Sequence, residues 1–225
     1  MALPRRNSPK RVAIVAMGLS HRDYVLACAS MGGRWAQFDE VWAINAMGGV
    51  IDCDLVFMMD TPDYLTNKGE TNLSLSGYKS WLSRVKVPVL TSFPNKDLAP
   101  TSVPYPLEDV LNEIRYPYLN GTVAYAVAYA ILTGVKELSL FGCDYTYPGD
   151  RHGSESGRGN VEFLLGIAVS RGMDISVAQN SSLLDTNLPE REKFYGYEGR
   201  VRLGTSSSGE IIVDFEEKSN ASDGS

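Results

Sequence analysis

Histidine and cysteine are scarce in this 225-residue chain, which limits the metal chemistry that it can support. The only histidines are His21 and His152, and the three cysteines, Cys28, Cys53 and Cys143, form no CxxC pair. A structural zinc site needs four nitrogen or sulfur ligands at close spacing, so no metal site is predicted. Widely spaced cysteines in apolar stretches are typical of buried thiols in a reducing compartment, and we therefore expect a cytoplasmic protein.

Long apolar runs and clusters of positive charge are missing as well. The longest apolar run, residues 123–132, is too short to span a bilayer, and no signal-peptide pattern follows the basic residues 4–11, so we expect no membrane association. The formal net charge of -6 argues against a dedicated nucleic-acid-binding protein, which needs a concentrated basic face. The absence of a P-loop motif excludes a kinase of that class.

Strand-like and helix-like stretches alternate along the chain. The strand-like runs are residues 11–16, 40–45, 54–59, 85–92, 137–141 and 173–179, and the helix-like stretches are residues 20–31, 78–85, 107–114, 120–133 and 156–171. This alternation predicts a doubly wound, mostly parallel, Rossmann-like α/β sheet with helices on both faces. We expect a single such domain over residues 1–192, followed by a small β-hairpin and a disordered tail in residues 193–225.

Polar residues and glycine follow the predicted strands at the points where these strands end. They are Gly18, Ser20, Asn45, Asp60 and Asp144. In an open α/β sheet the ligand crevice lies outside the carboxyl ends of the strands, so these residues are expected to converge on one crevice. For Asp144 an alternative remains, because an aspartate after a strand often caps its own loop.

Two further polar pairs have both a structural and a functional interpretation. Asn120 and Gly121 open the helix-like stretch 120–133, where asparagine caps the exposed amides and glycine allows a phosphate to approach the backbone. Asp60 and Asp63 lie three residues apart and could hold a divalent ion, but a pair of carboxylates in a proline turn is a weak motif. We expect no essential metal.

The stretch GCDYTYPGDRHGSESGRGN, residues 142–160, gathers many polar groups after a predicted buried strand. Its imidazole, His152, has an ordinary pKa near ~6.5 and suits proton abstraction at neutral pH. Tyr145 and Tyr147 can donate hydrogen bonds to an anion.

Arg158 in the same stretch has two interpretations. It can pair with Glu155 one helical turn earlier, which would be structural. Alternatively, it can add charge to an anion site formed by the amides of residues 157–159 at a helix start. Both remain open at this point.

Several short motifs, spread over residues 12–184, resemble one group of enzymes. The motifs are AMGLS, WAINAM, VFMMDTP, NGTVAYAVAYAILTGVKELSLFGCDY and QNSSLL. They resemble the bacterial lipooligosaccharide sialyltransferases and the related motility-associated glycosylation factors and archaeal hydroxymethylpterin pyrophosphokinases. The resemblance implies phosphate contacts from Gly18 and Ser20, a donor contact from Asn45 and a general base at His152. The chain departs from the pattern at Met17, where the family has asparagine, and in the short segment before the histidine, where the family has a long lid.

The resemblance implies a metal-independent glycosyltransferase with a nucleotide-sugar donor, favours a CMP-linked donor, and implies no tightly bound cofactor. The acceptor would be a hydroxyl group on a glycan, a small molecule or a modified nucleic-acid base. In this interpretation His152 is the base, and Arg151 or Arg158, together with Tyr147, stabilises the leaving phosphate. The residues at the strand ends, with Asn120, Gly121 and Tyr145, bind the donor. Two alternatives remain: an ATP-dependent pyrophosphokinase acting on a small heterocycle, which needs Mg²⁺, and a non-catalytic nucleotide-binding module. The oligomeric state is open.

Overall fold

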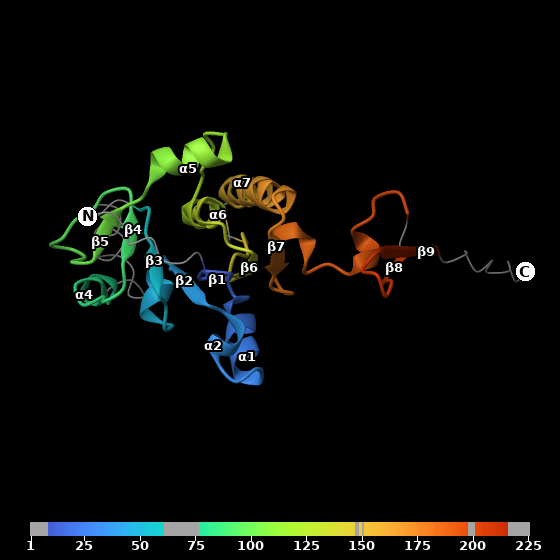
Figure 1. Cartoon of the computed structure of the whole chain (residues 1–225), viewed down its shortest axis with the longest axis horizontal. Coiled ribbons are helices and arrows are strands. Elements are labelled where there is room, and N and C mark those ends of the chain that lie inside the picture. Colours follow the sequence, from blue (N-terminus) through green and yellow to red (C-terminus); the bar gives the residue numbers. More distant parts are fainter. Residues whose placement is uncertain (1–8, 61–76, 147–148, 150, 198–200, 216–225) are drawn as a thin grey trace, which may run out of the picture.

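The computed structural model describes residues 9–60, 77–146, 149, 151–197 and 201–215. A parallel sheet of seven strands forms its centre, in the order β5-β4-β3-β2-β1-β6-β7 (Figure 1). The strands are β1 (Arg11–Val15), β2 (Glu40–Ile44), β3 (Leu55–Phe57), β4 (Val89–Thr91), β5 (Ser102–Pro104), β6 (Glu137–Phe141) and β7 (Asp174–Val177). The predicted α/β class with a parallel sheet is confirmed.

The strand order reverses direction once, next to β1. From β1 the chain builds outward through β2, β3 and β4 to β5, and it then returns to place β6 on the other side of β1. Both neighbours of β1 are parallel to it, with Ile14 opposite Trp42 on one side and opposite Leu140 on the other. The turns after β1 and β6 therefore lie at the topological switch point of the sheet, where such folds bind ligands.

Helices cover both faces of the sheet. They are α1 (His21–Ser30), α2 (Arg34–Gln37), η1 (Asn45–Gly49), α4 (Tyr78–Leu82), α5 (Leu107–Ile114), α6 (Thr122–Thr133), α7 (Arg151–Ser170), η3 (Leu183–Asp185) and η4 (Glu190–Glu192). Figure 1 shows α5, α6 and α7 on one side of the strands and α1 and α2 on the other. The arrangement agrees with the prediction of a doubly wound sheet.

Alternate residues of a central strand pack into the two hydrophobic cores on opposite faces of the sheet. Val12 and Ile14 of β1 belong to the core that includes α6. Ala13 and Val15 belong to the second core, together with Tyr24 of α1. Successive side chains of a strand point to opposite faces, so a central strand buried on both sides reads as a continuous apolar run. This explains why the RVAIV sequence of β1 is apolar at nearly every position.

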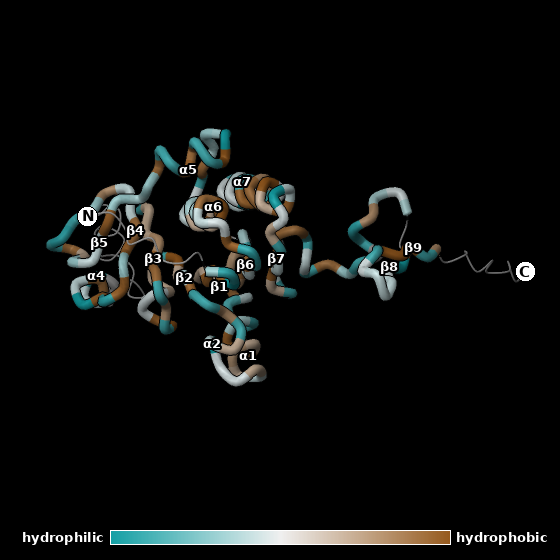
Figure 2. The backbone as a smooth tube through the Cα atoms, in the orientation of Figure 1, coloured by the Kyte–Doolittle hydropathy of each residue, from teal (hydrophilic) through white to brown (hydrophobic). Residues whose placement is uncertain are grey.

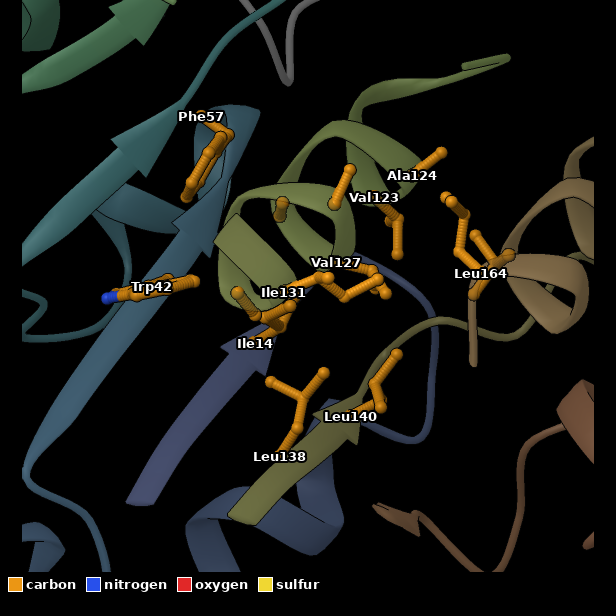
Figure 3. Packing of buried hydrophobic residues seen from close by; sticks show 14 of the residues in the cluster. Ile14, Trp42, Phe57, Val123, Ala124, Val127, Ile131, Leu138, Leu140 and Leu164 are labelled. Atoms are coloured by element: carbon orange, nitrogen blue, oxygen red, sulfur yellow. The ribbon is translucent and has the colours of Figure 1, made fainter. Parts of the chain in front are cut away.

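The helix α6 lies in the middle of the larger core. Figure 3 shows Ile14 and Leu140 on the sheet side of this helix and Leu164 of α7 beside it. Alanine and valine occupy much of α6, and seven of its residues are buried, which allows the strands and α7 to pack closely around it. In Figure 2 hydrophobic segments mark the strands of the sheet and the two helices α6 and α7.

The structure corrects the predicted edges of the sheet. Residues 93–106, where the sequence predicts no strand, contain the short edge strand β5, which pairs in parallel with β4. Its last residue is Pro104. An edge strand accepts proline because an N–H group that faces away from the sheet takes part in no hydrogen bond between strands. The predicted core strand at residues 173–179 is the opposite edge, β7, and its residues alternate between exposed and half-buried.

The helix α7 begins at Arg151, five residues earlier than the predicted start at residue 156. The three glycines at positions 153, 157 and 159 favoured a loop, but the helix continues through them. The second half of the polar stretch after β6, residues 151–160, is therefore helical.

The predicted C-terminal hairpin is present as a separate two-stranded sheet. Its strands β8 (Val201–Thr205) and β9 (Ile211–Phe215) are antiparallel, and Figure 1 shows them beyond β7, apart from the main sheet. The domain boundary at residue 192 stays a prediction, and the tail from residue 216 lies outside the described residues. Within the described part of the chain, none of the helices combines the length and the apolar character that a membrane span requires.

Candidate functional site

The turns that follow β1 and β6 are bonded to each other at the switch point. The amide of Gly18 donates to the carbonyl oxygen of Gly142 at 2.8 Å. Ser20 donates to the carboxylate of Asp144 twice, from its amide at 2.8 Å and from its hydroxyl group. The same hydroxyl oxygen accepts a hydrogen bond of 2.8 Å from the Gly142 amide. Ser20 and Asp144 are buried, so these bonds form one closed polar network.

Glycine is required in both turns by close packing. Gly142 has a φ of 68°, and a Cβ atom there would lie 2.1 Å from the carbonyl oxygen of Ala16. A Cβ atom on Gly18 would lie 2.6 Å from the Oδ2 atom of Asp144. The missing side chain of Gly18 therefore makes room for Asp144.

The segment after β7 joins the same turn. The hydroxyl of Ser181 donates to the carbonyl oxygen of Cys143 at 3.0 Å, and that of Ser182 donates to the carbonyl oxygen of Asp144. These two hydrogen bonds hold the backbone of Cys143 and Asp144 in place. In the sequence analysis this segment appears only as the QNSSLL motif.

Asn45 and Asp60, which follow β2 and β3, form a second pair. The Nδ2 atom of Asn45 donates to the Oδ2 atom of Asp60 at 3.2 Å, and Asn45 has a φ of 51°. Its buried Oδ1 atom has no hydrogen-bond partner among the described residues and remains able to accept one. The hydrogen bonds of the described residues thus join Ser20 with Asp144 and Asn45 with Asp60, but they do not link the two pairs. The second carboxylate of the weak metal motif, Asp63, lies outside the described residues.

Asn120 is held by α7 and does not cap α6. The residue at the cap position is Gly121, and it makes no side-chain capping bond, so the predicted asparagine cap is wrong. The backbone amide of Asn120 donates to the side chain of Asn160, and its own side chain donates to Ser156. Asn160 is fully buried and also donates to the carbonyl oxygen of Tyr118 at 2.9 Å.

Asn160 is a structural residue that the sequence analysis missed. Its signal was a single amide at the start of the apolar stretch NVEFLL, on the buried face of α7. Such a buried amide normally satisfies several backbone groups at once.

Neither interpretation of Arg158 agrees with the structure. Its guanidinium pairs with Glu162 at 2.8 Å and with Asp185 at 2.8 Å, whereas Glu155 pairs with Arg151. Burial disfavours the charge of Arg158, but the hydrogen bonds to these two carboxylates outweigh that effect and raise its pKa. The amides of residues 157–159 lie inside α7 and donate along the helix, so they form no anion site.

The remaining predicted residues have different surroundings. His152 is exposed on the first turn of α7. Tyr145 has a φ of 48°, and its ring lies against α7, because a Cβ atom on Gly157 would be 2.6 Å from the Cε1 atom of the tyrosine. Tyr147 lies outside the described residues.

The cysteines behave largely as expected. Burial raises the pKa of Cys53 to about 11 and raises that of Cys143 further, so both remain protonated thiols at neutral pH. Cys28 is half-buried. The described residues contain no group of three side chains suited to holding a metal ion.

Comparisons with known proteins give similarity to solved structures only. No family model and no curated protein matches the chain. The sialyltransferase CstII from Campylobacter jejuni in complex with the substrate analogue CMP-3FNeuAc shares 17% sequence identity over 77% of this chain and 83% of that chain, with a TM-score of 0.46. A structure of CstII from Campylobacter jejuni with cytidine-5'-monophosphate shares 16% identity over 77% and 82% of the two chains, with a TM-score of 0.46. A structure of the sialyltransferase CST-II with a trisaccharide acceptor and CMP shares 18% identity over 77% and 83%, with a TM-score of 0.45.

Proposed function

We propose that this chain is a glycosyltransferase that moves a sugar from a CMP-linked donor to a hydroxyl acceptor without a metal ion. The observation that carries the proposal is the bonded pair of turns at the switch point, because this is where parallel α/β sheets bind nucleotides. The motifs of these two turns, AMGLS and FGCDY, are also those that resemble the sialyltransferases.

The turn after β1 offers unpaired backbone donors for a phosphate. The amides of Gly18 and Ser20 are already bonded to Gly142 and Asp144. Met17 and Leu19 have amides without a hydrogen-bond partner among the described residues, and both residues are exposed. In the proposed complex the amides of Met17 and Leu19 bind phosphate oxygens, and Gly18 and Ser20 fix the shape of the turn.

The proposed transfer has a simple electron balance. The bond between the anomeric carbon and the phosphate oxygen breaks, and its electron pair leaves with CMP. The acceptor oxygen bonds to the same carbon, and its proton goes to a base, which in this proposal is His152. Hydrogen-bond donors aimed at the leaving phosphate stabilise the transition state, by ~3 kcal/mol for each well-placed donor.

A donor screen on the full chain in the presence of EDTA tests the proposal. CMP-sialic acid at about 100 times its Kd should raise Tm by roughly 5–10 °C, and CMP should be released faster than in buffer alone. UDP- and GDP-linked sugars, and ATP with Mg²⁺ in place of EDTA, serve as comparisons. The proposal fails if CMP-sialic acid gives neither a Tm shift nor CMP release, and turnover of ATP alone would favour phosphoryl transfer.

A further inference from the structure

His21 is fixed in the turn after β1 by its own ring. The Nδ1 atom lies 2.7 Å from the carbonyl oxygen of Gly18. A carbonyl oxygen only accepts hydrogen bonds, so Nδ1 carries the hydrogen whether the imidazole is neutral or charged. The Nε2 atom therefore carries a hydrogen, and can donate a hydrogen bond, only in the charged imidazolium.

The Nε2 atom is available to a ligand. His21 is half-buried, and no partner for Nε2 occurs among the described residues. The carbonyl that holds the ring belongs to Gly18, whose amide is bonded to Gly142 across the switch point. The ring is thus attached to the joined turns of β1 and β6, in the turn that also contains Met17 and Leu19, whose amides have no partner among the described residues.

The proposed reaction needs a cation or a strong donor near the leaving phosphate, and the arginines expected to supply it are already engaged. Arg158 is neutralised by Glu162 and Asp185, and Arg151 pairs with Glu155. Moving Arg158 to a phosphate would break its ion pair with Glu162 within α7 and its ion pair with Asp185, which joins α7 to the segment after β7. His21 has no such competing partner at Nε2 among the described residues.

We propose that His21 acts as the charged imidazolium, whose Nε2–H group donates a hydrogen bond to the phosphate of the CMP moiety and stabilises it as the glycosidic bond breaks. This inference rests on the proposed function. No proton is transferred in this step: the phosphate leaves with the bonding electrons, and the hydrogen bond strengthens as negative charge develops on the phosphate oxygen.

The substitution His21→Asn separates the ligand contact from the structural one. The side-chain nitrogen of asparagine takes a position close to that of Nδ1 and still donates to the Gly18 carbonyl, but nothing replaces Nε2. Arg22→Asn is the matched control, because Arg22 is the next residue of α1, is exposed, and makes no side-chain hydrogen bond to the described residues. The affinities of wild type and both variants for CMP and for cytidine, measured by NMR titration, give the phosphate contribution directly.

The loss of a hydrogen bond to a charged group predicts a Kd for CMP about 10-fold or more higher in H21N, with an unchanged Kd for cytidine. R22N should bind both ligands as wild type does. An H21N variant with the wild-type ratio of CMP to cytidine affinity overturns the role of His21 and leaves the proposed function standing. A wild-type protein that binds no CMP overturns the proposed function and this role together.

If H21N folds poorly, an NMR spectrum of the histidine ring nitrogens in the wild-type protein provides a second test of the inference. The chain has two histidines, and a His152→Asn background would assign both sets of ring signals. CMP should shift the His21 Nε2 resonance, and cytidine should not. Equal shifts with both ligands, or no shift with CMP, would contradict the inference.

Discussion

Asp144 accepts two hydrogen bonds from Ser20, although the two residues lie 124 positions apart in the chain. One comes from the backbone amide and the other from the hydroxyl group, which itself accepts from the Gly142 amide. These bonds join the turns after β1 and β6 and so determine the shape of the switch point. The Asp144 carboxylate, for which the sequence indicates no partner, is thus hydrogen-bonded inside the fold.

Ser20→Ala should lower the free energy of unfolding by ~2–3 kcal/mol. The substitution removes one bond to the buried carboxylate and leaves the Gly142 amide without an acceptor, and each unsatisfied buried group costs about 1–3 kcal/mol. Urea unfolding provides the measurement. Ser30→Ala, at the exposed last residue of α1, is the control and should change stability by less than ~0.5 kcal/mol. Equal values for the two variants would contradict the network.

Gly142→Ala should be far more damaging than Gly172→Ala. Both glycines have a positive φ, 68° and 79°, so alanine pays a backbone cost of ~1–2 kcal/mol at either position. Only at Gly142 does the new Cβ meet a backbone atom, the carbonyl oxygen of Ala16. We expect a loss above ~4 kcal/mol, or no folded protein, for G142A. Similar unfolding midpoints for the two variants would show that the turns are not in close contact.

Two glycines of α7 should respond to alanine with opposite signs. Alanine is favoured over glycine in a helix interior by up to ~1 kcal/mol. At Gly159 nothing lies within 4 Å of the new Cβ atom, and G159A should stabilise the protein by ~0.5–1 kcal/mol. At Gly157 the Cβ atom meets the ring of Tyr145, and overpacking of this kind costs ~1–3 kcal/mol. The unfolding temperatures of the two variants provide the measurement. Stabilisation by G157A would mean that the Tyr145 ring is not packed against α7.

Asp39 should contribute stability that depends on pH. Its carboxylate accepts hydrogen bonds from the amides of Arg11 and Lys10 and pairs with the Arg11 guanidinium, and the bond from the Arg11 amide is the largest cause of its lowered pKa. A lowered folded-state pKa means that the stabilisation is present above the unfolded value, ~3.8–3.9, and is lost as the pH falls through the folded value.

The substitution Asp39→Asn should therefore cost ~1 kcal/mol at pH 7, a modest value because more than a third of the side chain is exposed. The difference from wild type in urea unfolding should shrink as the pH is lowered through the acidic range. A difference that stays constant with pH would contradict the assignment.

The regular elements were predictable because each has a local cause. The apolar run of β1, the alanine-rich α6 and the glycine at the C-terminal end of α6, Gly134, follow from short-range rules of burial, propensity and backbone freedom. The three-residue strand β5 was missed because so short a strand between prolines has no periodicity to detect. The start of α7 was misplaced because its glycines and polar residues are typical of a loop.

The location of the site was predictable, but the partners of its residues were not. The sheet topology alone brings the residues after β1 and β6 to one edge. Whether Arg158 bonds Glu155 or Glu162 depends on where the helix starts, and its bond to Asp185 depends on a turn 27 residues later. The ring orientation of His21 depends on a carbonyl oxygen that no sequence pattern reports.

The most direct test of the account is to locate the nucleotide by NMR. Backbone amide spectra of the full chain are recorded during a titration with CMP in EDTA. Binding at the switch point predicts the largest shift changes at Met17 and Leu19 and in residues 142–145, with the hairpin of residues 201–215 unchanged. Shift changes confined to other parts of the chain, or none at saturating CMP, would contradict it.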